Sequence, residues 1–352
     1  MKNTKEIKVG NVIIGGNNPV IIQSMTNTPT KNIEATINQI NELVKAGAKI
    51  VRMTVMDMED AEAVKEIKAK TTVPLVADIH FDYKLALKAI ENGIDKIRIN
   101  PGNIGSDDRV KAIVDACKEK NIPIRIGINS GSLEKKLYQK YGGVTPEAML
   151  ESISHHVELL ESMDFYNIVL SVKATDIQTT IKTNYLLSKK FKYPIHIGLT
   201  ESGTVKSGTV RSSYVLGVLL NDNIGDTIRV SLTGDPVNEI PVAKEILSMF
   251  GLYHKPTLIS CPTCGRTAYN MEHIVNEIES FLNSLNSNIK VAIMGCAVNG
   301  PGEAKDADIG IAGGIGEALL FKKGEIIKKI PEDKILEELK NEIINIINKK
   351  VE

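Results

Sequence analysis

The chain has 352 residues, with 43 basic and 43 acidic side chains, so its formal net charge is zero. That balance argues against a protein that binds nucleic acid or an anionic membrane surface, because such proteins carry a basic excess. The apolar content of 42% is typical of a folded protein, and no run approaches the ~20 apolar residues of a membrane helix. Residues 1–19 lack the apolar stretch of a signal peptide, so we expect a cytoplasmic protein whose cysteines are reduced.

Short β-branched runs alternate with helical patterns through the first 235 residues. The helical patterns over 33–46 and 83–92, for example, each end at a glycine, which is a common helix stop. Strands that alternate with helices predict a parallel sheet, and eight such units predict a closed (β/α)8 barrel of the TIM type. An open doubly wound sheet is the main alternative. The eight strands begin near Val20, Lys49, Pro74, Lys96, Pro123, Asn167, Pro194 and Thr227.

Every second side chain of these strands is polar, although parallel strands covered by helices are usually apolar on both faces. Successive side chains of a strand point to opposite faces, so the polar residues share one face and the isoleucines and valines the other. The polar face lies toward the carboxyl ends of the strands, where the active sites of such barrels lie. It carries Arg52, Asp78, His80, Arg98, Asn100, Arg125, Asn129, Lys173, Thr200, Arg229 and Ser231.

Five of these side chains are cations, and in a barrel they converge on one space. Uncompensated buried cations cost several kcal/mol each, and the nearby acids Asp78 and Glu201 are too few to neutralise them. A bound polyanion is the simplest counter-charge, and guanidinium groups suit phosphate oxygens. The alternative is a network of buried salt bridges with loop carboxylates. Asp78 and His80 could also form a metal pair, but with two ligands visible we favour hydrogen bonds to substrate or to the arginines.

The cysteines follow a different pattern. Cys117 belongs to an apolar helical stripe and is expected to be a core residue. Cys261 and Cys264 form a C-x-x-C turn after a strand at 257–260, and Cys296 follows a strand at 291–294. Structural zinc sites and [4Fe–4S] clusters both normally take four ligands, but a cluster's unique iron accepts a non-cysteine ligand. Glu303 is the nearest candidate, and zinc held by the same four residues remains the alternative.

The part of the chain that carries these cysteines is expected to be a small α+β domain. Helices are predicted over 270–283 and 333–349, with further strands at 318–321 and 325–330. We therefore predict two domains, a substrate-binding barrel over 1–254 and a cluster-binding domain over 255–352.

Several motifs in both halves are distinctive, among them ADIHFD at 77–82, RIGINSGSL at 125–133, GLTESG at 198–203, SCPTCGR at 260–266 and GCAVNGPGEA at 295–304. Together they resemble the 4-hydroxy-3-methylbut-2-en-1-yl diphosphate synthase family over essentially the whole chain. The resemblance implies reductive ring opening and dehydroxylation of 2-C-methyl-D-erythritol 2,4-cyclodiphosphate, in non-mevalonate isoprenoid biosynthesis, with two electrons delivered through a [4Fe–4S] cluster.

The same resemblance assigns roles to individual residues. It implies a cluster held by Cys261, Cys264, Cys296 and Glu303, and it matches Glu201 to the acid that assists protonation. Ferredoxin or flavodoxin is the implied electron donor. The diphosphate-binding residues of the family match Arg52, Arg98, Asn100, Arg125, Asn129, Lys173, Arg229 and Ser231.

Chain geometry predicts how the two domains meet. A helix over 237–250 would run ~20 Å back down the barrel from its mouth, and the next seven residues reach at most ~23 Å. The linker would therefore barely bring the second domain back to the mouth of the barrel in its own chain. We therefore expect a head-to-tail homodimer, with which the family resemblance agrees.

Two other functions remain open at this point. One is a phosphate-binding lyase or transferase with a structural zinc, since the barrel resembles the pteroate-synthase type. The other is a non-enzymatic iron–sulfur redox sensor, which would leave the ring of cations unexplained.

Overall fold

The structure is a computed structural model that describes residues 4–297 and 300–349. The chain divides into two compact units, Met1–Leu252 and Tyr253–Glu352. Each unit has its own sheet and its own core, and each is described separately below.

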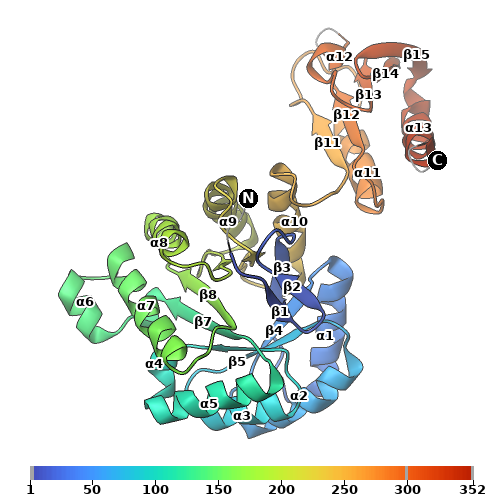
Figure 1. The fold of residues 1–352 in the computed structure, drawn as a ribbon. Coiled ribbons are helices and arrows are strands. Elements are labelled where there is room, and N and C mark those ends of the chain that lie inside the picture. Colours follow the sequence, from blue (N-terminus) through green and yellow to red (C-terminus); the bar gives the residue numbers. More distant parts are fainter. Residues whose placement is uncertain (1–3, 298–299, 350–352) are drawn as a thin grey trace. The chain divides into compact units, whose positions relative to one another are not determined.

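The first unit is built on eight parallel strands (Figure 1). The first six strands pair in chain order, the seventh pairs with the eighth, and the eighth pairs with the first through Thr227 beside Ile21. A bridge between Leu170 and Ile195 joins the remaining two edges, so the sheet closes into a barrel. The prediction of a closed barrel is confirmed, and the alternative prediction of an open doubly wound sheet is wrong. The strands are β3 (Ile21–Met25), β4 (Ile50–Thr54), β5 (Leu75–Asp78), β6 (Lys96–Ile99), β7 (Ile124–Asn129), β8 (Ile168–Lys173), β9 (His196–Ile197) and β10 (Thr227–Ile228).

Helices follow the strands and cover the outside of the barrel. Several begin at a residue whose side chain accepts a backbone N–H, such as Asn32 and Asp57, and α1 ends at Gly47 with φ of 122°. Cys117 is buried with the apolar stripe of α5, as predicted, and burial raises the pKa of its thiol. The covering helices are α1 (Ile33–Ala46), α2 (Met58–Lys70), α3 (Tyr83–Glu91), α5 (Asp107–Lys120), α7 (Pro146–Ser162), α8 (Ile177–Lys190), α9 (Val205–Asn221) and α10 (Glu239–Met249).

Shorter elements fill the connections. The loops after β6 and β7 contain the helices α4 (Pro101–Ile104) and α6 (Lys135–Tyr141), and a 3-10 turn at Pro236–Asn238 precedes α10. The helix predicted over 237–250 is therefore two pieces, because Pro236 and the side chain of Asp235 start the turn before α10 begins.

An antiparallel hairpin of β1 (Ile7–Val9) and β2 (Val12–Ile14) precedes the barrel. Its apolar side chains share a core cluster with Ile50, Val76 and Val169, which lie at or next to the first residues of β4, β5 and β8. The hairpin thus packs against the amino-terminal ends of the strands. The sequence analysis did not predict it, because two strands of three residues are too short to show a periodicity.

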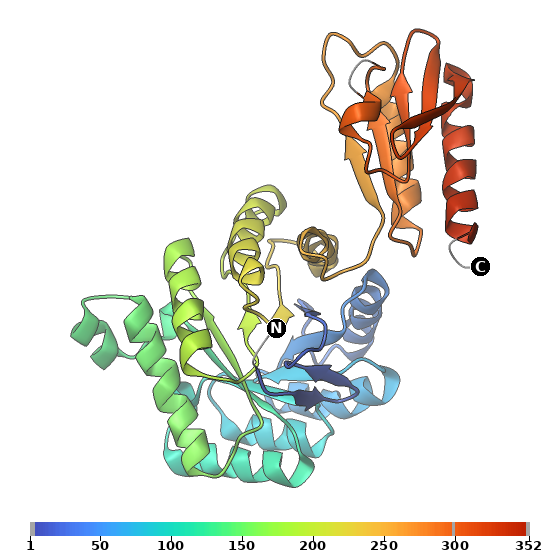
Figure 2. The ribbon, with the colours of Figure 1, turned by 45° about the horizontal axis from the view of Figure 1, so that its top comes forward.

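The second unit contains a five-stranded mixed sheet (Figure 2). Its first three strands are parallel and its last two antiparallel. Alternate residues of β12 and β13, among them Val291 and Ile311, pack in one core with α11 (Met271–Asn283) and α13 (Ile335–Lys349). The opposite set, including Ala292 and Ala312, packs in a second cluster next to α12 (Gly300–Glu303). The strands are β11 (Thr257–Ser260), β12 (Lys290–Met294), β13 (Ile309–Gly313), β14 (Glu317–Lys322) and β15 (Glu325–Pro331).

The α+β prediction for this unit is therefore confirmed. Among the described residues, no helix is long and apolar enough to cross a membrane.

Candidate active site

The inner face of the barrel encloses a polar cavity of about 210 Å³. Ten of the eleven residues predicted for the polar face line it, together with Gly127 and Ser171. Alternation along the strands is the reason, because it turns every second side chain of each strand inward. The ten are Arg52, Asp78, His80, Arg98, Arg125, Asn129, Lys173, Thr200, Arg229 and Ser231.

Asp78 pairs with two of the cations. Its Oδ1 lies 2.9 Å from Nη1 of Arg98, and its Oδ2 lies 3.6 Å from Nε of Arg52. Burial alone would raise the pKa of Asp78, but the two guanidinium groups hold it below its ordinary value. Asp78 is therefore a fixed negative charge that orients two arginines toward the cavity.

Glu239 pairs with a third cation, Arg229, through two contacts. Nη2 of Arg229 lies 3.0 Å from Oε1 and Nε lies 3.1 Å from Oε2 of this carboxylate, which is 2% exposed. Ser24 donates a further hydrogen bond to Oε2. The sequence analysis missed Glu239 because it belongs to α10 rather than to a strand, so its parity gave no signal. Three of the five cations are thus in salt bridges, but with carboxylates of β5 and α10 rather than with the loop carboxylates of the alternative interpretation.

Arg125 and Lys173 have no carboxylate partner within the described part of the chain. Arg125 is 1% exposed, and its Nε and Nη1 have no hydrogen-bond partner. Burial lowers the pKa of Arg125, and Arg52 and Arg98 lower it further. Burial likewise lowers the pKa of Lys173, followed by the charges of Arg52 and Arg125. Five cations thus face two carboxylates, an excess of three positive charges when all are protonated.

Two glycines on the inner face make room for these cations. A Cβ atom at Gly127 would lie 2.5 Å from Nε of Arg98, which is far inside van der Waals contact. A Cβ atom at Gly198 would lie 2.6 Å from the carbonyl oxygen of Arg229 and 3.0 Å from Nζ of Lys173. The sequence signal was present, since both glycines lie at the polar parity of their strands.

Two predicted residues lie outside the cavity lining. Asn100 precedes α4, and its Oδ1 accepts the backbone N–H of Gly102 at 3.1 Å, so its side chain closes a turn. Glu201 follows Thr200 in the loop after β9, with φ of 52°, and its Oε2 accepts a hydrogen bond from Thr175 at 3.0 Å. The loop that carries Glu201 therefore begins at the cavity, because Thr200 lines it. The carboxylate of Glu201 is held by Thr175 and is not part of the lining.

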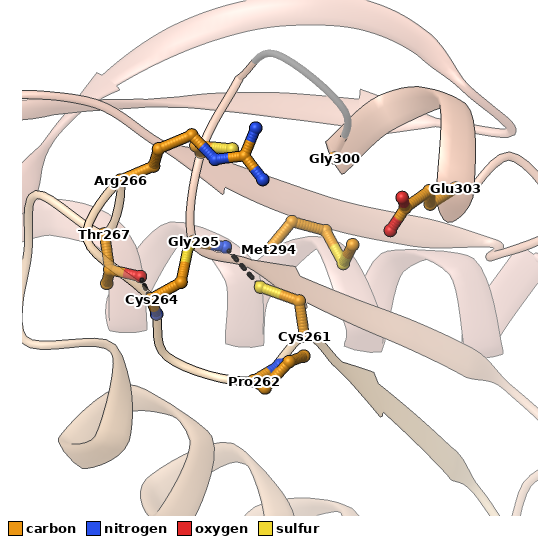
Figure 3. A pocket seen from close by; sticks show the side chains of 10 residues that line it. Cys261, Pro262, Cys264, Arg266, Thr267, Met294, Gly295, Gly300 and Glu303 are labelled. Carbon is orange, nitrogen blue, oxygen red and sulfur yellow. Dashed lines mark hydrogen bonds between the residues drawn. The ribbon is translucent and has the colours of Figure 1, made fainter.

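The four predicted cluster ligands line a pocket of about 230 Å³ in the second unit (Figure 3). Cys261 and Cys264 come from the loop after β11, and Cys296 from the loop after β12. These parallel strands are neighbours, so their carboxyl ends bring the loops together. Glu303 is the last residue of α12. Residues 298 and 299, between Cys296 and Glu303, lie outside the described residues.

The pocket has the electrostatics of a thiolate site. The backbone N–H of Gly295 donates to Sγ of Cys261 at 3.0 Å, as Figure 3 shows. Hydrogen bonds from the backbone and side chain of Arg266 lower the pKa of Cys264. Among the described residues, no three His, Cys, Asp or Glu side chains stand close enough to hold one metal ion. A polynuclear core spreads its ligands more widely, because each ligand binds a different metal atom.

Comparisons with known proteins cover both units. A family model described as the GcpE TIM-barrel domain matches residues 4–244, and one described as the GcpE protein C-terminal domain matches residues 257–345. The chain is 59% identical over 340 residues to the 4-hydroxy-3-methylbut-2-en-1-yl diphosphate synthase (flavodoxin) of Clostridium perfringens, covering 96% of this chain and 97% of that protein. It is 58% identical over 341 residues to the protein of the same name from Ruminiclostridium cellulolyticum, covering 97% of each.

Solved structures with the same fold are more distant in sequence. The dihydropteroate synthase of Stenotrophomonas maltophilia matches 70% of this chain and 97% of its own, with a TM-score of 0.51 and 13% identity. The Yersinia pestis dihydropteroate synthase matches 70% of this chain and 98% of its own, with a TM-score of 0.50 and 11% identity. These likenesses concern the fold alone, and they confirm the expected pteroate-synthase type of barrel.

Because Arg125 lacks a carboxylate partner among the described residues, we expect its removal to raise the stability of the protein and to weaken its binding of anions. Arg125→Met removes a buried cation that has no carboxylate partner among the described residues, so the free energy of unfolding of the ligand-free protein should rise by about 1–3 kcal/mol while its affinity for pyrophosphate falls. Arg229→Met is the matched control, because it leaves Glu239 buried and unpaired and should lower that free energy by about 3 kcal/mol. Urea unfolding and calorimetric titration measure both quantities, and equal losses of stability would contradict the assignment of Arg125.

The close approach at Gly127 gives a second prediction. Gly127→Ala should displace the guanidinium of Arg98 and weaken pyrophosphate binding about tenfold or more, the effect of losing one charge-assisted contact. Gly217→Ala on α9 is the control, since its Cβ would meet Phe250 at an ordinary 3.5 Å. Calorimetric titration of both variants checks this, and unchanged binding in Gly127→Ala would show that Arg98 does not contact the anion.

Proposed function

Because the chain belongs to the GcpE family, we propose that it is an oxidoreductase with the activity for which its relatives are named, the synthesis of 4-hydroxy-3-methylbut-2-en-1-yl diphosphate. Its substrate in this proposal is 2-C-methyl-D-erythritol 2,4-cyclodiphosphate, in the non-mevalonate route to isoprenoids. The reaction opens the cyclic diphosphate, removes a hydroxyl group and consumes two electrons. The observation that carries the proposal is the pairing, in one chain, of an over-cationic barrel cavity with a pocket of three cysteines and a glutamate.

The barrel's part in the reaction is to bind and orient the diphosphate. The excess of positive charge suits a phosphorylated anion, and Nε and Nη1 of Arg125 offer donors that have no hydrogen-bond partner among the described residues. Asp78 and Glu239 hold the other guanidinium groups in place, so little side-chain entropy remains to be lost on binding. A lyase with a structural zinc or a redox sensor is not favoured, because the relatives matched over nearly the whole chain are named as synthases.

We assign the ligands of a [4Fe–4S] cluster to Cys261, Cys264, Cys296 and Glu303. The donor set fits this group, because soft thiolates bind iron and an amide N–H already points at Sγ of Cys261. When bound, the cluster supplies the electrons and a Lewis-acidic iron. The hard carboxylate of Glu303 would be the most exchangeable of the four ligands, so Glu303 is the residue that would give way to an oxygen-bearing substrate.

We assign the proton donor to Glu201. The hydroxyl of Thr175 is bound to Oε2, so Oε1 is the oxygen that would carry the transferred proton. The left-handed backbone conformation of Glu201 costs about 1 kcal/mol or more in a residue other than glycine. Such strained conformations are common at functional sites, where the backbone sets the direction of a side chain. Thr200, the preceding residue, lines the anion cavity and ties the position of Glu201 to it. A general acid here would let the departing hydroxyl leave as water.

The remaining assignments concern the molecular context. Flavodoxin is the electron donor that we favour over ferredoxin, because the names of the relatives contain it. We place the protein in the cytoplasm, where a reducing medium keeps its four free cysteines available.

We also propose a head-to-tail homodimer in which each cluster-binding unit closes the barrel of its partner. The helix α10 follows the last strand and returns along the barrel wall, away from the mouth. Seven residues separate Met249, at its end, from Thr257 at the start of β11, and they span at most ~23 Å. In the proposed dimer, the cluster-binding unit of a second copy of the chain closes the barrel mouth that the short linker keeps the first copy's own unit from closing.

Replacing the carboxylate ligand tests the cluster assignment. Glu303→Ala should leave the free energy of unfolding of the unloaded protein within about 0.5 kcal/mol, because the residue ends a four-residue helix. After anaerobic loading, the electron paramagnetic resonance signal of the reduced cluster should change. Glu325→Ala, at an exposed position of β15, is the control and should keep the wild-type signal and the iron and sulfide content. A Glu303→Ala spectrum identical to that of the wild type would remove Glu303 from the ligand set.

Mixing two inactive variants tests the dimer. Lys173→Met disables the barrel and Cys264→Ser disables the cluster, so neither homodimer should turn over the cyclic diphosphate. If the sites form between chains, unfolding and co-refolding an equal mixture should restore about one quarter of the wild-type activity, because half the dimers are mixed and each has one intact site. Sites formed within one chain would give no recovery, and full activity in a strictly monomeric preparation would also exclude the dimer.

A further inference from the structure

Three buried side chains from neighbouring strands form a row inside the barrel. Nζ of Lys173 lies 3.3 Å from Nε2 of His196, and Nδ1 of His196 lies 2.7 Å from Oγ1 of Thr227. His196 and Thr227 are fully buried, and Lys173 is 8% exposed. Lys173 alone of the three lines the anion cavity, so the row connects the cavity to the interior of the barrel.

Lys173 stands in a field of permanent charge. The guanidinium groups of Arg52, Arg125, Arg229 and Arg98 all act on it, in that order of strength. Asp78 lines the cavity and Glu239 pairs with the lining residue Arg229, so both carboxylates are already engaged by arginines. Arginine does not give up its proton in proteins, whereas lysine does so readily when it is buried. Lys173 is therefore the lining cation able to relieve the repulsion by becoming neutral.

A second lysine needs to be considered as well. Lys96 is fully buried, and its Nζ lies 3.3 Å from Oε1 of Gln23. Burial lowers its pKa, as do Arg125 and Arg52. Lys96 does not line the cavity, so an entering anion would contact Lys173 rather than Lys96.

The row is suited to either charge state of Lys173. Burial lowers the pKa of His196, and Arg125 and Lys173 lower it further, so the imidazole is neutral, with one donor and one acceptor nitrogen. If Lys173 is an ammonium group, Nε2 of His196 accepts from it and Nδ1 donates to Thr227. If Lys173 is an amine, Nε2 can donate to it, and the hydroxyl of Thr227 then donates to Nδ1. In either state the four polar atoms Nζ, Nε2, Nδ1 and Oγ1 of the row each keep a hydrogen bond.

We propose that Lys173 is neutral in the ligand-free barrel and takes up one proton from solvent when an anion of the phosphate type enters the cavity, with His196 as the positioning residue that adapts its tautomer to both states. The step is an amine plus a proton giving an ammonium ion, and no electrons are transferred. The inference rests on the proposed diphosphate site and adds a proton to its binding equilibrium.

The direction of the pH dependence follows from linkage. Burial holds the pKa of Lys173 in the free protein below its ordinary value, and an adjacent anion raises it. Below the free-state pKa the lysine is already charged, so binding takes up no proton. Between the free-state and bound-state pKa values one proton enters with each anion, and the dissociation constant rises about tenfold per pH unit.

Sulfate is the probe, because as a stable dianion it does not itself titrate near neutral pH. Calorimetric titration of the wild-type protein with sulfate, in buffers of different ionisation heat between about pH 6.5 and pH 9.5, gives the protons taken up per anion. We expect uptake approaching one proton in part of this range. Sulfate binding without any uptake across the range would overturn the inference and leave the proposed function standing. No sulfate binding at all would contradict the anion cavity and both proposals.

Three variants assign the proton to its site. Lys173→Arg keeps a permanent cation, so proton uptake should vanish and the dissociation constant should no longer depend on pH. His196→Leu removes the acceptor for the ammonium group and should move the onset of uptake to lower pH. His196→Gln, which keeps a donor and an acceptor, should restore part of that shift, whereas a merely structural role would give two variants with the wild-type onset.

Lys96→Met is the matched control, since it removes the other buried lysine. It should retain the proton taken up with each sulfate ion. If Lys96→Met abolished uptake while Lys173→Arg retained it, the assignment to Lys173 would be wrong. The wild-type titration decides whether any proton enters, even if a variant fails to fold.

Discussion

The central constraint on this molecule is the repulsion among cations that the barrel gathers in a nearly dry space. Asp78 and Glu239 offset three of them, and Arg125 and Lys173 remain without a carboxylate partner in the described part of the chain. Such a cavity is costly to the fold and becomes favourable when an anion fills it. Binding energy is thus stored in the ligand-free barrel as the mutual repulsion of its arginines, which remains even when Lys173 is neutral.

Other features of the barrel serve this concentration of charge. Gly127 and Gly198 have no Cβ atom, and this absence leaves room for the side chains of Arg98 and Lys173 in the interior. The hairpin of β1 and β2 packs against the opposite ends of the strands and contributes apolar contacts there. Stability is therefore supplied at one end of the barrel, while the other end carries the groups that bind.

Much of this could be predicted from alternation alone. Parallel strands place every second residue inward, so arginines at one parity on several strands predict a shared cavity from the sequence alone. Glu239 could not be found this way, because it reaches Arg229 from a helix, and Asn100 deviates because its strand ends at Ile99. The pairing of His196 with Lys173 depends on side-chain conformations across strands, which no periodicity encodes. The cysteine pocket was foreseeable because its members follow strand ends, and neighbouring parallel strands end at one edge.

That edge also fixes an order of events in the life of the protein. Ser260 stands beside Ile293 in the β11–β12 ladder, and 29 residues, including all of α11, separate the two strands in sequence. Cys296 therefore has no reason to be near Cys261 and Cys264 in an unfolded chain. If the pocket takes the proposed iron–sulfur cluster, the sheet has to form before iron and sulfide can be bound by all three cysteines, and chains that lack iron would be folded with an empty pocket rather than unfolded.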